Sequence, residues 1–224
     1  MSDRRRATGI VLAGGRSVRM GADKASLKLS NQTLLSRVVQ TVSLVCPEVI
    51  IAGGEQRLAD GFGSDVRWVA DPPGSAGPLA GVTAGLQAAR HDACLVVACD
   101  MPFLNPALLS HLFDRLEKFD AVVPVSHGVS QYLHAAYSRS AATTAQTLLR
   151  LKARSVHELV VRLQVLHLSE KQCARFDPIG LSCFNMNTPA DLALALTLDA
   201  HSSSGAAISR CEYSIDRAGG PRNG

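Results

Sequence analysis

A glycine-rich segment follows the first apolar run of the chain and reads LAGGRSVRMGADK (12–24). Gly14 and Gly15 would let a phosphate chain approach the backbone with no Cβ atom in the way, and Gly21 permits a second tight turn. The spacing does not fit a P-loop, because no Lys-Ser/Thr pair follows, and it does not fit G-x-G-x-x-G. The alternative is a glycine turn with solvated arginines. Phosphate binding is favoured because the segment also carries three cations, Arg16, Arg19 and Lys24.

Two aspartates come at the ends of predicted strands. Asp100 closes the run ACLVVACD (93–100) and is followed by apolar residues. Its carboxylate could hold Mg²⁺, which takes one or two carboxylates and completes its shell with phosphates and water; capping the next turn is the alternative. Asp71 precedes a segment in which Gly77 and Gly81 flank a helix start at Pro78. An ordinary strand-to-helix connection would explain those glycines equally well, so Asp71 is the stronger candidate for a ligand contact.

A third polar pair lies late in the chain, in CFNMNTPADL (183–192). If this segment is a strand, Asn185 and Asn187 share one of its faces and could complete a polar site. The alternative is that Asn187 only precedes a helix start at Thr188.

Together these residues favour phosphoryl or nucleotidyl transfer, which needs positioning and charge neutralisation more than a covalent nucleophile. The chain has no G-x-S-x-G motif, and Asp100-Met-Pro differs from the Asp-x-Asp of many glycosyltransferases. Transfer of a nucleotidyl group is therefore the leading interpretation.

The elements that must position these residues alternate between strands and helices. Apolar runs at 8–13, 48–52, 66–70, 93–100 and 120–125 are continuous enough to be buried on both faces. Helices are predicted over 33–45 and from Pro78 and Pro106, and capping boxes at Ser155–Glu158 and Thr188–Asp191. We therefore expect an α/β fold: one three-layer, Rossmann-like domain with a mostly parallel central sheet and helices on both faces. Ligands of such sheets bind beyond the carboxyl ends of the strands.

The domain is expected to span 8–198, after a flexible N-terminus (1–7) and before a disordered tail (199–224) rich in Ser, Gly and Arg. The formal charge of +4 is modest and not clustered, so nucleic-acid binding is not expected. No apolar run approaches a membrane span, so a soluble, cytoplasmic protein is expected. The six cysteines lack a C-x-x-C pair, and the histidines have no ligand spacing, which argues against a zinc site.

The motifs resemble those of the molybdenum cofactor guanylyltransferase family, within the nucleotidyltransferase superfamily. The family pattern L-A-G-G-x-S-x-R-M-G-x-D-K is similar to residues 12–24 at every fixed position. G-P-L-A-G stands at 77–81, C-D-M-P at 99–102 and N-x-N-T-P at 185–189, in the family's order. There are two departures: Ala52-Gly53-Gly54 stands where some members have an Asn, and Gln131-Tyr132-Leu133 where the family often has Gln-Pro-Leu.

The resemblance implies that the N-terminal half binds GTP and that the C-terminal half binds molybdenum-molybdopterin. The implied nucleotide-binding residues are Leu12, Ala13, Gly14, Gly15, Lys24, Asp71, Gly77, Gly81 and Asp100, with Mg²⁺ as cofactor on Asp100. The implied acceptor site is the region 130–137, in which His134 stands out, with Arg154, Asn185 and Asn187. The implied catalytic residues are Arg19, Lys24 and Asp100.

The expected reaction transfers GMP from GTP to the terminal phosphate of molybdopterin and releases pyrophosphate. The alternatives are a cytidylyltransferase acting on the same pterin, a sugar-phosphate nucleotidyltransferase, and a nucleotide-binding module without turnover. A monomer is expected, with transient contacts to molybdenum-insertion proteins and apo-molybdoenzymes.

Overall fold

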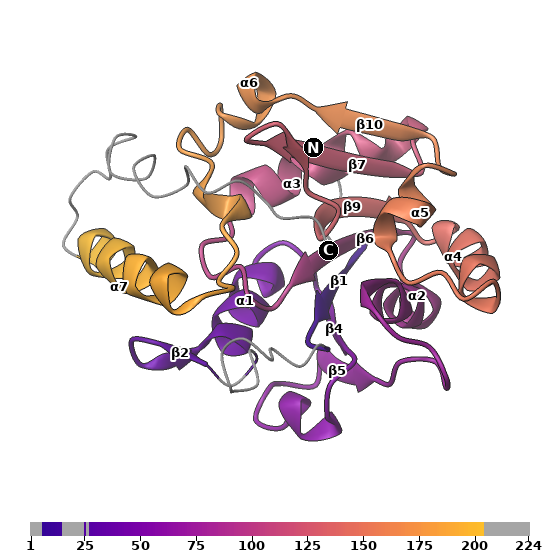
Figure 1. Cartoon of the computed structure of the whole chain (residues 1–224), viewed down its shortest axis with the longest axis horizontal. Helices are drawn as coiled ribbons and strands as arrows, with labels where there is room; N and C mark the ends of the chain where they lie inside the picture. Colours follow the sequence, from indigo (N-terminus) through magenta and orange to yellow (C-terminus); the bar gives the residue numbers. More distant parts are fainter. Residues whose placement is uncertain (1–5, 15–24, 26, 204–224) are drawn as a thin grey trace.

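The computed structural model describes residues 6–14, 25 and 27–203 of the chain. Its centre is an eight-stranded sheet in which seven strands follow the order β10-β7-β9-β6-β1-β4-β5 and β8 pairs with β7 (Figure 1). The strands of the main path are β1 (Ala7–Leu12), β4 (Glu48–Ala52), β5 (Val66–Val69), β6 (Ala93–Ala98), β7 (Ala121–Ser126), β9 (His134–Ser138) and β10 (Val165–Leu168). The eighth strand is β8 (Val129–Ser130).

The sheet is mostly parallel, as predicted. β1 lies between β4 and β6 and is parallel to both, and β10 is parallel to β7. β9 is the exception on this path, because it is antiparallel to β6 and to β7. All six residues of β1 are buried, which explains why its sequence, apart from Thr8, has no polar side chain and no polar alternation.

Helices cover both faces of the sheet, so the predicted three layers are confirmed. Leu35, Val38 and Val42 of the first helix share a buried cluster with Leu108 and Leu112 of the third. The opposite face of the sheet has a separate cluster, which includes Leu79, Leu148 and Leu159. The helices on the first face are α1 (Leu34–Ser43), α3 (Pro106–Asp114) and α6 (Glu170–Cys173), and those on the second are α2 (Pro78–Ala88), α4 (Ala141–Arg150) and α5 (Val156–Val160).

A third, smaller apolar cluster joins the segment around Leu29 and Leu34 to the C-terminal part of the described chain. It brings Leu29 and Leu34 against Phe184, Met186 and Leu198. The elements that supply them include the hairpin of β2 (Lys28–Leu29) and β3 (Gln32–Thr33), α1, and the last helix, α7 (Pro189–Ser203). The remaining short elements are three 3₁₀ turns: η2 (Gln56–Ala59), η3 (Leu116–Lys118) and η4 (Leu181–Cys183).

Two expected boundaries differ from the structure. Ala7 already belongs to β1, although the flexible N-terminus was expected to include it. α7 continues to Ser203, five residues past the expected end of the domain at 198, because Asp199 is held by hydrogen bonds from Ser30 and Arg37. The rest of the predicted tail, 204–224, lies outside the described residues.

The predicted strand around Asn185 and Asn187 is wrong. Residues 184–187 follow η4 in an irregular segment. The Met186 N–H of this segment donates to the Asp100 carbonyl oxygen at 2.9 Å. The alternation in the sequence has another cause: Phe184 and Met186 are buried in the third cluster, while Asn185 and Asn187 are more exposed. Burial on one side of an extended segment imitates a strand pattern without a partner strand.

Candidate functional site

The carboxyl ends of the four neighbouring strands β6, β1, β4 and β5 bring the first three predicted segments together. Leu12 pairs in register with Ala52 on one side and Ala98 on the other. Past the strand ends, the Ala13 N–H donates to the Ala52 carbonyl oxygen at 2.9 Å, and the Cys99 N–H donates to the Leu12 carbonyl oxygen at 3.1 Å. The segment starting at Leu12 therefore lies directly beside the one that carries Asp100.

Asp71 lies at the centre of a group of glycines. A Cβ atom built on Gly14 would be 3.6 Å from Asp71 Oδ2, and one built on Gly81 would be 3.5 Å from Asp71 Oδ1 and 3.1 Å from Leu12 Cδ2. The structure thus brings together Leu12, Ala13, Gly14, Asp71 and Gly81 from three separate motifs. Close backbone approach to one carboxylate is what a nucleoside pocket at this edge would need.

The Asp71 side chain could accept a hydrogen bond from a ligand. Its Oδ1 atom is buried and has no hydrogen-bond partner among the described residues, and burial raises the pKa of this carboxyl group. A buried acceptor without a partner is costly, so it marks a place where a ligand with N–H groups would be stabilised.

Asp100 lies two residues beyond the end of β6 and is only 8% exposed. Its backbone carbonyl accepts the N–H of Met186, so the segment with Asn185 and Asn187 is attached to the same strand end. Within the described parts of the chain, no group of three or more His, Cys, Asp or Glu side chains could hold a metal ion. Mg²⁺ can bind through one or two carboxylates with phosphates and water completing its shell, so Asp100 is the residue that could hold it.

Arg154 lies beside the first turn of α2. The Leu79 N–H donates to the Arg154 carbonyl oxygen at 3.1 Å, and a Cβ atom on Gly77 would be 2.8 Å from that same oxygen. Arg154 is exposed and directly precedes Ser155, whose predicted capping box opens α5. Gly77, which is predicted to bind the nucleotide, is thus adjacent to Arg154, which is predicted to bind the acceptor.

The two asparagines differ in their local contacts. Asn185 is half-buried and its Nδ2 donates to the Cys183 carbonyl oxygen at 3.2 Å. Asn187 is exposed, and its backbone N–H donates to Asp191 at 2.8 Å. Thr188 and Asp191 bond reciprocally at the start of α7, which confirms the predicted capping box.

His134 does not reach the surface, although it was predicted to lie in the acceptor site. It is 0% exposed, on the face of β9 that packs towards α3, and its Nε2 atom lies 2.7 Å from the Ser182 hydroxyl oxygen. That hydroxyl accepts the N–H of Asn105, the N-cap residue of α3. Burial lowers the pKa of His134 to about 4, so the ring is neutral at pH 7. From this position it can act on a ligand only through the residues around it.

Gly15, Arg19 and Lys24 lie outside the described residues. Their predicted roles in phosphate binding and catalysis stay predictions.

The sequence did not reveal the contacts that shape the turn after β4. Trp68 donates its indole N–H to the Gly53 carbonyl oxygen at 3.0 Å, and Gly53 and Gly54 both have positive φ angles, 77° and 65°. A pair of glycines directly after a buried strand is a signal for this turn, but nothing local in the sequence links it to Trp68.

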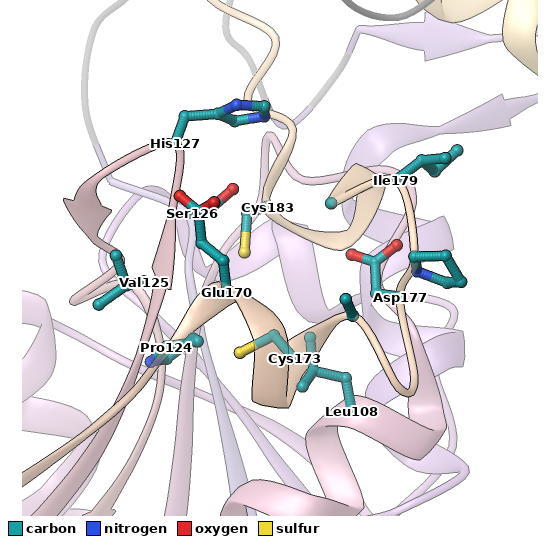
Figure 2. Close-up of a pocket in the computed structure, with 13 residues that line it drawn as sticks. Leu108, Pro124, Val125, Ser126, His127, Glu170, Cys173, Asp177, Ile179 and Cys183 are labelled. Atoms are coloured by element: carbon teal, nitrogen blue, oxygen red, sulfur yellow. The ribbon is translucent and has the colours of Figure 1, made fainter. Parts of the chain in front are cut away.

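A pocket of about 80 Å³ opens at the carboxyl end of β7, between this strand and α6 (Figure 2). Ser126 and His127 line one side, and Asp177 and Ile179 lie across from them. Asp177 accepts the N–H groups of Leu181 and Ser182, and burial raises its pKa despite these bonds. No described residue of the lining is a lysine or arginine, so a phosphate group would lack a cationic partner there.

Among the described residues, no helix has the length and apolar character that a membrane span requires.

Comparison with known proteins assigns the chain to a family. Residues 9–167 match the domain described as a MobA-like NTP transferase domain. The chain is 37% identical over 199 residues to a probable molybdenum cofactor guanylyltransferase of Pelotomaculum thermopropionicum, covering 89% of this chain and 96% of that protein. It is 33% identical over 190 residues to a molybdenum cofactor guanylyltransferase of Desulfosudis oleivorans, covering 84% and 93%.

A solved structure shows the same fold. Molybdopterin-guanine dinucleotide biosynthesis protein A from Archaeoglobus fulgidus superposes with a TM-score of 0.76 at 28% identity, covering 87% of this chain and 98% of that one. With the motifs held at one edge of a mostly parallel sheet, the chain belongs to the molybdenum cofactor guanylyltransferase family of nucleotidyltransferases.

Proposed function

We propose that this protein transfers GMP from GTP to the terminal phosphate of molybdenum-molybdopterin, giving a guanine dinucleotide cofactor and pyrophosphate. The observation that carries the proposal is the position of Asp100. It stands beside the strand end that starts the glycine-rich segment, and its own carbonyl oxygen holds the segment of Asn185 and Asn187. One carboxylate thus lies between the two regions where the two substrates are expected.

The nucleotide side favours guanine on chemical grounds. Guanine presents two adjacent donors, N1–H and N2–H, to a carboxylate, and Asp71 offers a buried acceptor oxygen that has no partner among the described residues. Cytosine and adenine each offer only an amino group at the corresponding edge. Asp71 is therefore the proposed reader of the base.

The acceptor side is proposed to lie between Arg154 and the Asn185–Asn187 segment. Arg154 is exposed at the start of α5, next to the first turn of α2, so its guanidinium could meet an acceptor phosphate. The asparagine amides can donate to and accept from a pterin ring.

In the proposed reaction, a terminal phosphate oxygen of the acceptor attacks the α-phosphorus of GTP. A new P–O bond forms there, the bond to the bridging oxygen breaks, and the electron pair leaves with pyrophosphate. The attacking oxygen is already anionic, so no general base is required. Asp100 would hold Mg²⁺, which when bound supplies charge neutralisation for the phosphates. Arg19 and Lys24 are proposed to stabilise the leaving pyrophosphate.

The test measures pyrophosphate release by the purified protein with Mg²⁺ and molybdenum-molybdopterin, comparing GTP, CTP and ATP in parallel. Release with GTP alone is expected. Release with CTP would instead indicate a cytidylyltransferase, and no release with any of the three would contradict the proposed reaction.

A variant tests the assignment of Asp100. Asp100→Asn keeps the side-chain size and removes the charge, so kcat is expected to fall by at least about 10²-fold while the melting temperature stays within a few degrees. Asp92→Asn, on an exposed aspartate of the opposite edge, serves as the matched control and should keep full activity. Full activity of Asp100→Asn would remove Asp100 from the catalytic site.

A further inference from the structure

The turn after β4 lies beside the residues of the candidate nucleotide site. It begins where β4 and β1 end side by side, and Gly53 is buried while Gly54 is exposed. A Cβ atom on Gly53 would lie 3.1 Å from Asp71 Oδ1 and 3.2 Å from the Gly14 Cα atom. A Cβ atom on Gly54 would lie 3.0 Å from the Ala13 carbonyl oxygen. The turn therefore presents bare backbone to Asp71 and to the start of the glycine-rich segment.

Such a turn needs external support, because two consecutive glycines have a large conformational freedom to lose. The Gly53 N–H donates to the Val69 carbonyl oxygen at 3.0 Å. On the other side of the same residue, the Trp68 indole N–H donates to the Gly53 carbonyl oxygen, also at 3.0 Å. Both bonds to Gly53 thus come from β5, two and three residues before Asp71.

Trp68 is well suited to hold this turn. Its ring is half-buried and packs against the apolar cluster on the α1 face of the sheet, together with Leu58. Leu58 in turn lies under Gly54, since a Cβ atom there would be 2.7 Å from Leu58 Cδ1. A rigid ring with one donor fixes a peptide carbonyl at a small entropic cost.

We infer that Trp68 is a positioning residue for nucleotide recognition: its indole N–H fixes the Gly53–Gly54 turn against Gly14 and Asp71, so that the base meets preformed backbone and one carboxylate. The inference rests on the nucleotide site of the proposed function. Loss of the indole hydrogen bond should weaken GTP binding without slowing the chemical step. The reason is that β1 separates the end of β4, where the turn begins, from the end of β6, which precedes Asp100.

The first experiment compares Trp68→Phe with Val66→Ala in the pyrophosphate assay. Trp68→Phe keeps an aromatic ring and removes the donor, so KM for GTP should rise about tenfold with kcat within about twofold of the wild type. Val66→Ala is the matched control: it removes apolar contacts from the same strand and the same cluster, and should lower the melting temperature while leaving KM for GTP unchanged. An unchanged KM in Trp68→Phe, or an equal rise in both variants, would overturn the inference.

The second experiment uses the wild-type protein and needs no acceptor substrate. Trp68 is the sole tryptophan of the chain, so its fluorescence reports directly on this turn. Titration of the wild-type protein with GTP and MgCl₂ should give a saturable change in emission, larger than with CTP. No change at GTP concentrations that saturate a calorimetric titration would overturn the inference. If GTP binds but no pyrophosphate appears with the acceptor, the proposed function fails. The role of Trp68 is then tested separately by calorimetry, which compares the GTP Kd of Trp68→Phe with that of the wild type.

Discussion

At the scale of single residues, two polar side chains with buried atoms, Asp71 and His134, lie in different surroundings. Asp71 keeps one buried oxygen without a described partner and lies among glycines. His134 also keeps one buried atom, Nδ1, without a described partner, but it lies within the sheet, where its Nε2 contacts the Ser182 hydroxyl that accepts the Asn105 N–H. His134 therefore contacts the 181–187 segment from inside the sheet, and its predicted role at the acceptor stays a prediction.

The protonation of His134 should make stability depend on pH. Its pKa is about 4 in the folded protein and about 6.5 in an unfolded chain, so the unfolded state binds the proton first as the pH falls. The stabilisation is complete above pH 6.5 and is lost between about pH 6.5 and pH 4, by about 3 kcal/mol at most. Urea unfolding across this range should show a flatter pH profile for His134→Gln than for the wild type.

His111 provides the control for that measurement. Burial and the nearby Arg115 lower its pKa as well, but it lies at a more accessible position on α3, stacked on Phe176. His111→Gln should keep most of the wild-type pH dependence. Equal profiles for His134→Gln and the wild type would contradict the buried, neutral histidine.

At the scale of secondary-structure elements, the two ends of β1, β4 and β5 have opposite characters. The carboxyl ends carry glycines and Asp71, whereas the amino ends are held by a compact polar network. Glu48, at the start of β4 and 4% exposed, accepts the Thr8 hydroxyl at 2.6 Å and the Arg67 guanidinium at 2.9 Å. Arg67 also donates to the Ala88 carbonyl oxygen at the end of α2. The polar network thus holds the amino ends of these strands, at the edge of the sheet opposite to the candidate ligand site.

Glu48→Gln should lower the free energy of unfolding by about 2 kcal/mol at pH 7, because it weakens a buried charged network. Burial alone would raise the pKa of Glu48, but the bonds from Thr8, the Arg90 N–H and Arg67 lower it overall. Its stabilisation is therefore present above the ordinary glutamate pKa of about 4.3 and is lost as the pH falls through the lower folded value. The difference between variant and wild type in urea unfolding should shrink below about pH 4.

An exposed pair gives the matched control. Glu55 and Arg57 also form an ion pair, but both side chains are about two-thirds exposed, at 68% and 72%. Glu55→Gln should change stability by no more than about 0.5 kcal/mol. A loss as large as that of Glu48→Gln would mean that burial is not the deciding factor.

At the scale of the whole molecule, the last helix joins the two halves of the chain. Asp199 on α7 pairs with Arg37 on α1 at 2.6 Å and accepts the Ser30 hydroxyl of the hairpin at 2.5 Å. The third apolar cluster lies beneath these bonds and includes Phe184 and Met186, the neighbours of the asparagines. The hairpin that follows the glycine-rich segment and the proposed acceptor segment thus rest on the same helix (Figure 1).

Asp199→Ala should lower the free energy of unfolding by about 2 kcal/mol, because it leaves the partly buried Arg37 without its carboxylate. Asp92→Ala removes an exposed pair with Arg139 and should cost about 0.5 kcal/mol or less. Chemical denaturation of both variants at pH 7 makes the comparison. Equal small losses would show that α7 contributes little to holding the two halves together.

The sequence by itself determined the sheet, its mostly parallel strands and the placing of Asp71 and Asp100 at strand ends. Runs buried on both faces have a local signature, and a residue after such a run must lie at the carboxyl edge. The four motifs also sufficed to predict the family, which the comparisons confirmed. The roles of the individual site residues stay predictions until the variants are measured.

Only the tertiary structure decided which way His134 faces, how Asn185 and Asn187 are held, and where α7 ends. Each depends on partners more than forty residues away: Ser182 for His134, Asp100 for Met186, and Arg37 for Asp199. The bond from Trp68 to Gly53 spans a shorter distance in the sequence, but it too depends on tertiary structure, because it forms where β4 and β5 pair in parallel. Side-chain periodicity reports on burial but not on the identity of the neighbour, so contacts between distant segments become visible only once the sheet order is fixed.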